Sequence, residues 1–470
     1  MNNFYKILKI LDIKDKKNLV FLFVIILLTT FIELLNVGSF VALANIILNE
    51  DKIFRILENY PYLEKFFLGK DYSYVVFIFV VVALVILSFK AIILIFFFWV
   101  KNRFLFLYEV KLRDRLYKKY FKQNYSFFLK NDQSDLIRNI NTEVGNFRFV
   151  ALQVPAQIVL EFLIIFFIFS SLIYIKPLET ISLVLIFSTL VTLYYLLIKN
   201  YLKRWSKKRL ETESKIIKNL VEAFSMIKEI IVYKRSNYFI KKNYSDNFRL
   251  SNINVVNYFI AEIPRHLLEF CGFFLILVYL YIMMEYQNKN LEEIIFTLTL
   301  FSISIYKILP SYLKVINGFQ SLKYGSPVID IIFNDINLVE KNSLTNDTTS
   351  KIKFEKELKL ENINLNYEGK LLYKESLNLI VKKNEKVLIV GKSGSGKTSL
   401  LLMLAGLINP AEGKIFTDGK NILSNLDSWQ NKIAWVDQKT ILFDDTIKNN
   451  ITIYEDNNEF KVDKFNHAIK

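Results

Sequence analysis

Six long apolar runs constrain this chain more than any other feature of its sequence. Each is long enough to cross the roughly 30 Å hydrocarbon core of a bilayer, which takes about 20 helical residues. The runs cover residues 19–48, 74–100, 150–175, 178–198, 255–284 and 294–315. Hydrophobic residues make up 53% of the chain, which is too many for an ordinary soluble protein. We therefore predict an integral, multi-pass membrane protein whose membrane domain is an all-α bundle of six helices.

The charges between these runs predict the orientation of the chain. Residues 101–148 carry 11 basic and 5 acidic residues, and residues 199–249 carry 14 and 5. Residues 50–71 and 285–293 are net negative. Because Lys and Arg concentrate in cytoplasmic loops, we expect the N-terminus and everything after the sixth run to lie in the cytoplasm. Topology then accounts for the formal net charge of +16, and no nucleic-acid partner is expected.

The two long basic segments are expected to be helical extensions of the membrane helices, because their apolar residues recur with helical spacing. On the opposite side, residues 53–67 contain spaced apolar residues around Pro61. This pattern is compatible with a short amphipathic helix on the outer surface and equally with a structured loop.

A change in composition predicts the domain layout. We expect the membrane domain at residues 1–325, a polar linker at 326–350, and part of a soluble α/β domain at 351–470. Within the soluble part, alternating strand patterns occupy residues 351–366 and 377–381. An apolar run at residues 387–390 predicts a further strand.

Directly after that run, residues 391–398 read GKSGSGKT and fit the Walker A pattern. Glycines allow the backbone to curl so that N–H groups surround a phosphate, and the helix expected at residues 398–407 directs its positive end there. We expect Lys397 to reach the β and γ phosphates of ATP and the Thr398 hydroxyl to bind Mg²⁺. The residues predicted to bind the phosphates are Gly391, Ser393, Gly394, Ser395, Gly396, Lys397, Thr398 and Ser399.

Further motifs accompany this loop in a defined order. NYEG stands at residues 366–369, GKI at 413–415, and VDQ at 436–438. This order resembles the N-terminal half of an ABC-transporter nucleotide-binding domain, a P-loop NTPase fold. Together with six long helices ahead of it, the chain resembles an ABC exporter half-transporter. The resemblance implies that Tyr367 stacks on adenine and that Gln438 contacts Mg²⁺ and the attacking water.

In that family the C-terminal half of the domain supplies a signature loop, a Walker B Asp, a catalytic Glu and a switch His. None of these follows Gln438 before Lys470. The resemblance therefore implies that this chain, in a homodimer with a second copy, binds ATP but does not hydrolyse it appreciably, since no catalytic set is complete. Natural truncation and a fragment of a longer chain both remain open.

Ionisable residues within the apolar runs are costly in a membrane and are therefore candidates for function. They are Glu33, Lys90, Glu161, Glu262, Arg265, Glu269, Lys307 and Lys314. Arg265 and Glu269 are four residues apart and could pair on one helix face. Lys307 and Lys314 lie seven apart in a run that contains no acid, so we expect an anionic group in a central cavity to meet them.

Residues 263–269 and 306–314 also resemble the PglK-type lipid-linked oligosaccharide flippases. The resemblance implies that Arg265, Lys307 and Lys314 contact a lipid-linked anionic substrate that is flipped across the inner membrane, although lysines lack the bidentate fork of arginine. Two alternatives stay open. One is export of another lipid, a peptide or a drug, and the other is a degenerate membrane subunit that binds nucleotide without transporting.

Overall fold

A computed structural model describes residues 3–48, 71–175, 177–286, 291–338, 352–364, 366–367, 370–371, 376–438, 442–452 and 462–469. The chain divides into two compact units, and each is described by itself. Unit 1 comprises residues 1–123 and 127–340, and unit 2 comprises residues 124–126 and 341–470. The surface segment predicted at residues 53–67 lies outside the described residues.

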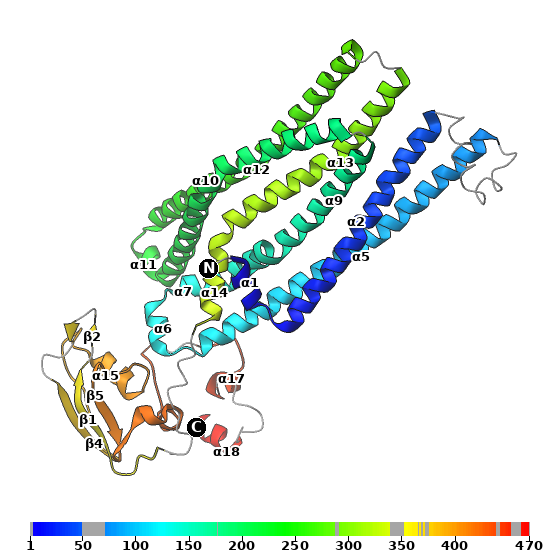
Figure 1. The fold of residues 1–470 in the computed structure, drawn as a ribbon. Coiled ribbons are helices and arrows are strands. Elements are labelled where there is room, and N and C mark those ends of the chain that lie inside the picture. The colour runs from blue at the N-terminus through cyan, green and yellow to red at the C-terminus, as the bar shows by residue number, and fades with distance from the viewer. Residues whose placement is uncertain are drawn as a thin grey trace. The chain divides into compact units, whose positions relative to one another are not determined.

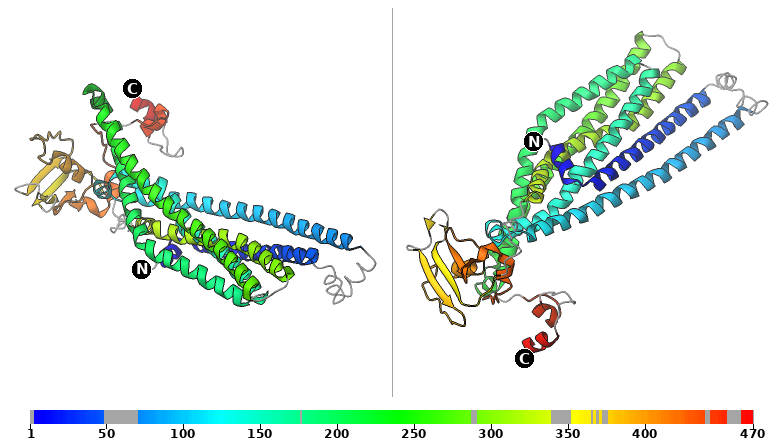
Figure 2. Two further views of the ribbon diagram at one scale, coloured as in Figure 1. Left: turned by 90° about the horizontal axis from the view of Figure 1, so that it is seen from above. Right: turned by 60° about the horizontal axis from the view of Figure 1, so that its bottom comes forward.

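Six long helices make up most of the described part of unit 1 and run side by side in a bundle (Figures 1 and 2). They are α2 (Ile13–Leu48), α5 (Tyr72–Phe121), α9 (Val154–Ile175), α10 (Pro177–Ser225), α12 (Ser236–Tyr286) and α13 (Leu291–Tyr324). Within the described residues, four stretches are long and apolar enough to cross a membrane: Tyr72–Phe121, Gln133–Tyr174, Thr180–Ser225 and Ser236–Met283. The first and sixth predicted spans fall in α2 and α13, many of whose side chains are not described. The predicted helical membrane domain is confirmed.

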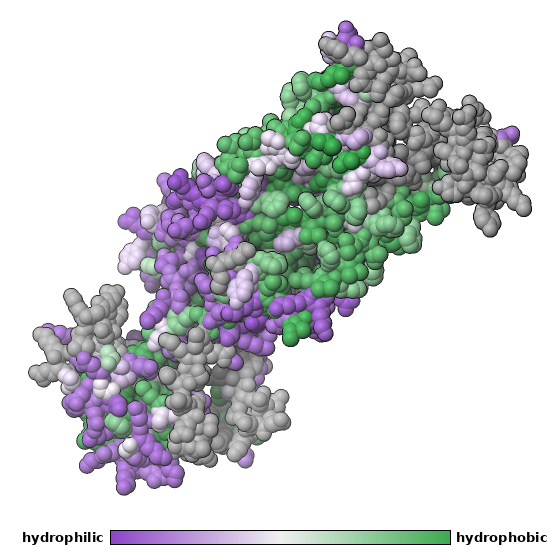
Figure 3. Space-filling view, in the orientation of Figure 1, coloured by the Kyte–Doolittle hydropathy of each residue, from purple (hydrophilic) through white to green (hydrophobic). Residues whose placement is uncertain are grey.

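Both long basic segments are helical, as their spacing predicts. Helix α5 continues beyond its apolar run to Phe121, and α10 continues to Ser225. Figure 3 shows the surface of the bundle changing from apolar along the helices to hydrophilic where these extensions lie. Each of these helices therefore has an apolar stretch suited to lipid, followed by a hydrophilic stretch suited to water.

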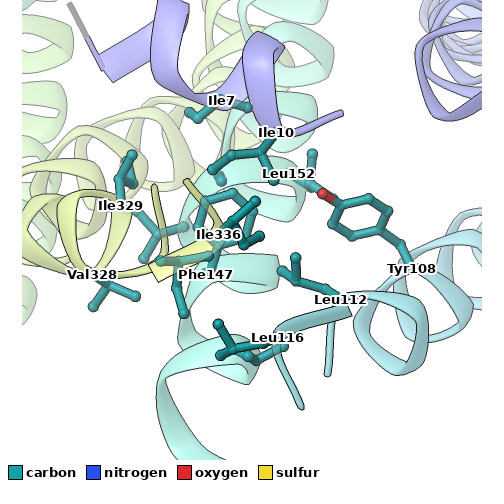
Figure 4. Packing of buried hydrophobic residues seen from close by; sticks show 14 of the residues in the cluster. Ile7, Ile10, Tyr108, Leu112, Leu116, Phe147, Leu152, Val328, Ile329 and Ile336 are labelled. Carbon is teal, nitrogen blue, oxygen red and sulfur yellow. The ribbon is translucent and has the colours of Figure 1, made fainter. Parts of the chain in front are cut away.

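Shorter helices gather at this hydrophilic end of unit 1. They are α1 (Asn3–Ile10), α7 (Gln133–Arg138), α8 (Val144–Phe147) and α14 (Ser326–Ile336), with π-helical turns at Asn139–Glu143 and Arg148–Gln153. Two others are α6 (Tyr125–Lys130), which follows α5 closely, and α11 (Ile227–Val232), which lies between α10 and α12. Figure 4 shows the apolar core that joins them, where Ile10 of α1, Leu112 of α5, Phe147 of α8 and Ile329 of α14 converge.

Helix α14 corrects one boundary expected from composition. Residues 326–336 were expected within the polar linker, yet they form a helix that buries Val328, Ile329, Ile332 and Ile336. These residues recur at helical spacing and line one face, which packs into the core of unit 1. Among the polar residues of α14, Asn334 is exposed, whereas Asp335 accepts hydrogen bonds from Tyr120 and Asn139.

Unit 2 contains a small antiparallel sheet with the order β4-β1-β5-β6. Its strands are β1 (Glu357–Asn364), β4 (Leu377–Lys382), β5 (Glu412–Thr417) and β6 (Lys420–Asn421), and a separate pair is β2 (Asn366–Tyr367) with β3 (Lys370–Leu371). The helices are α15 (Lys397–Leu404), α16 (Leu426–Gln430), α17 (Ile447–Thr452) and α18 (Val462–Ile469), with a 3₁₀ turn at Ile422–Ser424. Leu360, Ile363 and Ile415 of the sheet pack against Leu400 and Met403 of α15.

The apolar strand expected at residues 387–390 is not a strand in the structure. Both edges of β1 are already occupied, by β4 and by β5, and no described strand pairs with residues 387–390. Leu388 and Val390 are consequently 86% and 80% exposed. The local pattern was that of a strand, but strand formation requires a hydrogen-bonded neighbour.

Candidate functional site

The Walker A segment of unit 2 forms an exposed loop that ends at helix α15. Gly394 and Gly396 have φ angles of +80° and +89°, in the region that L side chains avoid. At Gly391 an added Cβ would lie 2.7 Å from Ser395 Oγ, a contact that rotation of the serine side chain could relieve. Glycine at positions 394 and 396 is therefore what allows the backbone to curl into a cradle.

The Lys397 ammonium spans this cradle. Its Nζ atom donates hydrogen bonds to the carbonyl oxygens of Gly391 and Lys392, each at 2.8 Å. Among the described residues no carboxylate pairs with it. The positive charge is thus held at the loop by neutral acceptors and is not neutralised, which suits binding of a phosphate anion.

Helix α15 begins at this loop without a side-chain cap on its first turn. Its uncapped N–H groups and the helix dipole both favour an anion at that end. Ser393, Ser395 and Thr398 are exposed, and Ser399 is half-buried. Backbone donors, one ammonium and several hydroxyls together fit the phosphates of a nucleotide, and the Thr398 hydroxyl supplies an oxygen of the kind that Mg²⁺ binds.

Two further residues, Tyr367 and Gln438, are predicted to contact the nucleotide. Tyr367 lies in the two-residue strand β2, and its side chain is outside the described residues. Gln438 is exposed, and its backbone N–H donates to the Asp437 carboxylate at 2.7 Å. The adenine-stacking role of Tyr367 and the Mg²⁺ role of Gln438 stay predictions.

A second candidate site is a cavity of about 650 Å³ in unit 1, lined by α12 and α13. Its lining is mostly apolar and includes Phe273, Ile305 and Leu309, with Arg265 and Glu269 among them. Arg265 Nε donates to Glu269 Oε1 at 3.0 Å, which is the helix-face pairing considered from their spacing. The cavity thus combines an apolar wall with one ion pair.

Two polar groups of this cavity were not singled out as substrate contacts from sequence. Glu262 lines it one turn before Arg265, and Asn317 lines it from α13. The buried Asn317 Oδ1 atom has no hydrogen-bond partner among the described residues. A ligand hydroxyl or amine could therefore donate to it, a property that the sequence signals only by a polar residue at the end of an apolar run.

Lys314 does not line this cavity but pairs across the bundle. Its Nζ atom donates to Glu161 Oε1 of α9 at 2.8 Å. Lys101 of α5 is buried nearby, with its ammonium 4.7 Å from the centre of the Phe98 ring. Sequence reasoning found no acid within the sixth run, and it missed that a neighbouring helix provides one. The side chain of Lys307 is outside the described residues.

Comparison with known families decides what kind of molecule carries these two sites. Residues 18–307, more than half of the chain, match the family described as ABC transporter transmembrane region. This chain belongs to the ABC transporter family. Residues 375–470 match the nucleotide-binding family described as ABC transporter, so the Walker A loop lies in an ATP-binding domain of the ABC type.

The ABC transporter fold is also seen in a solved structure. The chain superimposes on a bacterial Atm1-family ABC exporter with ATP bound, with a TM-score of 0.73 over 94% of this chain and 75% of that one. The two sequences are 14% identical, so the likeness concerns the fold alone. The membrane and nucleotide units thus have the arrangement of elements found in an ABC exporter.

Curated relatives of this ABC transporter chain have several transport functions. An ATP-dependent lipid A-core flippase of Desulfotalea psychrophila is 37% identical over 23% of this chain and 19% of its own. A glutathione/L-cysteine transport system ATP-binding/permease protein of Haemophilus influenzae is 35% identical over 27% of this chain and 21% of its own. A sublancin-168-processing and transport ATP-binding protein of Bacillus subtilis is 25% identical over 59% of this chain and 39% of its own. The matched stretches span about a fifth to two fifths of these relatives.

Proposed function

We propose that this chain is one half of an ATP-driven exporter that moves an amphiphilic, lipid-type substrate across the inner membrane. The observation that carries the proposal is the cavity between α12 and α13, whose mostly apolar lining includes an ion pair and the Asn317 oxygen, which has no hydrogen-bond partner among the described residues. Such a lining suits a molecule with an apolar chain and a polar head. The lipid A-core flippases among the relatives support a cargo of this class.

The energy source in this proposal is ATP with Mg²⁺, bound by Lys397, Thr398 and the Walker A backbone. The basic segments that extend α5 and α10 support an orientation in which they, the N-terminus and unit 2 face the cytoplasm. The proposed partner is a second copy of the chain, as the half-transporter layout implies. We include these as parts of one proposal.

A finer proposal concerns the head group of the substrate, for which a lipid-linked anion of the oligosaccharide type was expected. Arg265 is the described cation of the cavity, and it shares the lining with Glu262 and Glu269. Since Arg265 and Lys314 each have an acidic partner, recognition of an anion would depend mainly on Lys307. We therefore propose an amphiphile as the substrate class. That its head group is anionic is a separate hypothesis, which the following experiment tests.

The experiment is lipid translocation in proteoliposomes by a chain completed with the signature, Walker B and switch-His motifs, because the chain by itself is not expected to hydrolyse ATP appreciably. A fluorescent polyprenyl pyrophosphate and a fluorescent phosphatidylcholine serve as alternative probes, and ATP-dependent movement to the outer leaflet is measured. We expect Lys397→Ala to abolish movement and Lys392→Ala to retain it. Selective loss of the pyrophosphate probe in Lys307→Gln would support the anionic reading.

Two outcomes would count against the proposal. If Lys307→Gln and wild type moved both probes equally well, the proposal of an anionic head group would be wrong. ATP binding that is lost in Lys397→Ala, with no movement of either lipid by wild type, would instead favour a nucleotide-binding membrane subunit that does not transport.

A further inference from the structure

Helix α10 carries a row of exposed apolar residues that runs directly into a group of exposed cations. Leu193, Leu196 and Leu197 are 55%, 49% and 80% exposed. The exposed cations that follow are Lys203, Arg204, Lys207 and Lys208. At about 100° per residue, all seven side chains fall within an arc of roughly 140°. The apolar row and the cations therefore share one face of the helix.

The opposite face of α10 is held against the bundle, which sets the direction of this row. Leu202, Ser206 and Leu210 are buried there. The Ser206 hydroxyl donates a hydrogen bond to the carbonyl oxygen of Tyr324 at the end of α13. The row of leucines and cations consequently points away from the helices of this chain that pack on the opposite face of α10.

The four cations differ from the basic residues that follow them on α10. Arg209 pairs with Glu213 at 3.3 Å, Lys215 with Asp246 at 3.0 Å, and Lys218 with Asp132 at 2.9 Å. In contrast, Lys203, Arg204, Lys207 and Lys208 have no carboxylate partner among the described residues. Their charge is left for a partner outside this chain.

Two aromatic residues border this face, since at 100° per residue Tyr201 lies about 20° and Trp205 about 60° outside the arc, next to Lys208. The rings of Tyr201 and Trp205 stack with centroids 5.9 Å apart, and Lys208 Nζ lies 5.2 Å from the Trp205 ring. Tyr and Trp concentrate at membrane–water interfaces, where an apolar ring and a polar edge are both accommodated. The aromatic pair thus indicates the level at which α10 leaves the hydrocarbon.

The helix rise places the cations at the level of lipid head groups. Arg204 lies seven residues beyond Leu197, which is about 10 Å along the axis. The polar head-group region of one leaflet is roughly 5–7 Å deep. With Leu197 in hydrocarbon and Tyr201 at its border, the flexible cations around Arg204 reach the phosphate layer of that leaflet.

We propose that this face of α10, residues 201–208, binds the phosphate-bearing head groups of anionic phospholipids in the surrounding bilayer. The site is separate from the cavity between α12 and α13, so it rests on the membrane-spanning character of α10 and not on the nature of the cargo. Clusters of four to eight cations directly beyond a membrane helix are typical of segments that bind anionic lipid, and each cation strengthens attraction to an anionic surface by roughly fivefold. Anionic lipid at this position would hold α10 at a fixed depth.

The test uses the full chain in nanodiscs that contain phosphatidylcholine and phosphatidylglycerol. Either lipid is supplied in brominated form, and quenching of Trp205 fluorescence reports which one lies beside it; Trp205→Phe identifies the contribution of this residue. In wild type we expect phosphatidylglycerol to quench at least fivefold more than its bulk fraction predicts, with the excess falling as salt is added. The variant with Lys203, Arg204, Lys207 and Lys208 all changed to Gln should lose this excess.

A matched variant separates a local site from a general charge effect. Lys228, Lys234, Arg235 and Lys241 are also exposed, but they lie beyond the membrane-proximal part of α10. Changing these four to Gln should leave the phosphatidylglycerol excess within twofold of wild type. Size-exclusion and thermal unfolding profiles confirm that each variant folds. The proposal would be overturned if phosphatidylglycerol quenched wild-type Trp205 only in proportion to its bulk fraction. It would also be overturned if the two quadruple variants lost the phosphatidylglycerol excess equally.

Discussion

Lys314 and Glu161 join helices α13 and α9 through a hydrogen bond of 2.8 Å between Nζ and Oε1. The Glu161 residue is 1% exposed, and its Oε1 atom also accepts a hydrogen bond from Gln157 Nε2 at 2.5 Å. A buried carboxylate with two donors is well compensated, whereas one without them would be costly. The pair therefore has a structural role, and Lys314 has a counter-ion inside the protein.

This pair can be measured by a double-mutant cycle. Glu161→Gln and Lys314→Met should each lower the melting temperature, since each leaves one charged partner unmatched. The double variant should lose less stability than the sum of the losses in the two single variants. We expect a coupling free energy of about 1–2 kcal/mol, because Lys314 is half-exposed. Thermal unfolding in one detergent checks this, and strictly additive effects would show that the two side chains do not interact.

A pair of glycines in unit 2 offers a test of close packing. Gly413 and Gly419 have φ angles of +82° and +81°, so alanine carries a similar backbone strain at both, about 1 kcal/mol. At Gly413, however, an added Cβ would lie 2.2 Å from the backbone oxygen of Glu361, whereas at Gly419 nothing lies within 4 Å. We expect Gly413→Ala to lower the melting temperature of unit 2 far more than Gly419→Ala. Equal losses would contradict the packing of β5 on β1.

Asp418 should make unit 2 dependent on pH. Its carboxylate accepts backbone hydrogen bonds from Glu355 at 2.6 Å, Lys356 at 2.9 Å and Glu357 at 2.9 Å. These bonds, that from Glu355 first, hold the pKa of Asp418 below its ordinary value.

A lowered pKa in the folded state means that the ionised carboxylate stabilises the fold. This contribution is present above the ordinary pKa of about 4 and is lost as the pH falls through the lower, folded value. Asp418→Asn should therefore have a lower melting temperature than wild type at pH 7. This difference in melting temperature should shrink in more acidic buffer. Asp444→Asn is the control, and a gap that is independent of pH would contradict this account.

Removal of Mg²⁺ tests the proposed role of the Thr398 hydroxyl. We expect a chelator to weaken binding of a fluorescent ATP analogue by the wild-type chain about tenfold or more, because the Thr398 hydroxyl would hold Mg²⁺ and Mg²⁺ would offset the charge of the phosphates. Thr398→Val should bind the analogue weakly with or without the chelator, while Thr398→Ser should keep the dependence on Mg²⁺. If the chelator weakened binding of the analogue by Thr398→Val as much as it does for wild type, another oxygen would hold the metal.

Local patterns in the sequence determined much of this protein. The apolar runs are sufficient to specify long helices, because in hydrocarbon each backbone N–H must be satisfied within its own segment. The Walker A loop was equally predictable, since Gly394 and Gly396 permit a backbone curl that depends on few distant residues. The helical extension of α10 to Ser225 followed from residue spacing in the same way.

Only the tertiary structure decided which distant groups meet. Residues 387–390 had the pattern of a strand, yet β1 already pairs on both edges and leaves them without a neighbour among the described strands. Lys314 was assigned an external anion because its partner, Glu161, lies 153 residues away. Helical spacing shows which residues share a face, but the helices packed against that face determine whether it meets lipid, water or a charge of opposite sign.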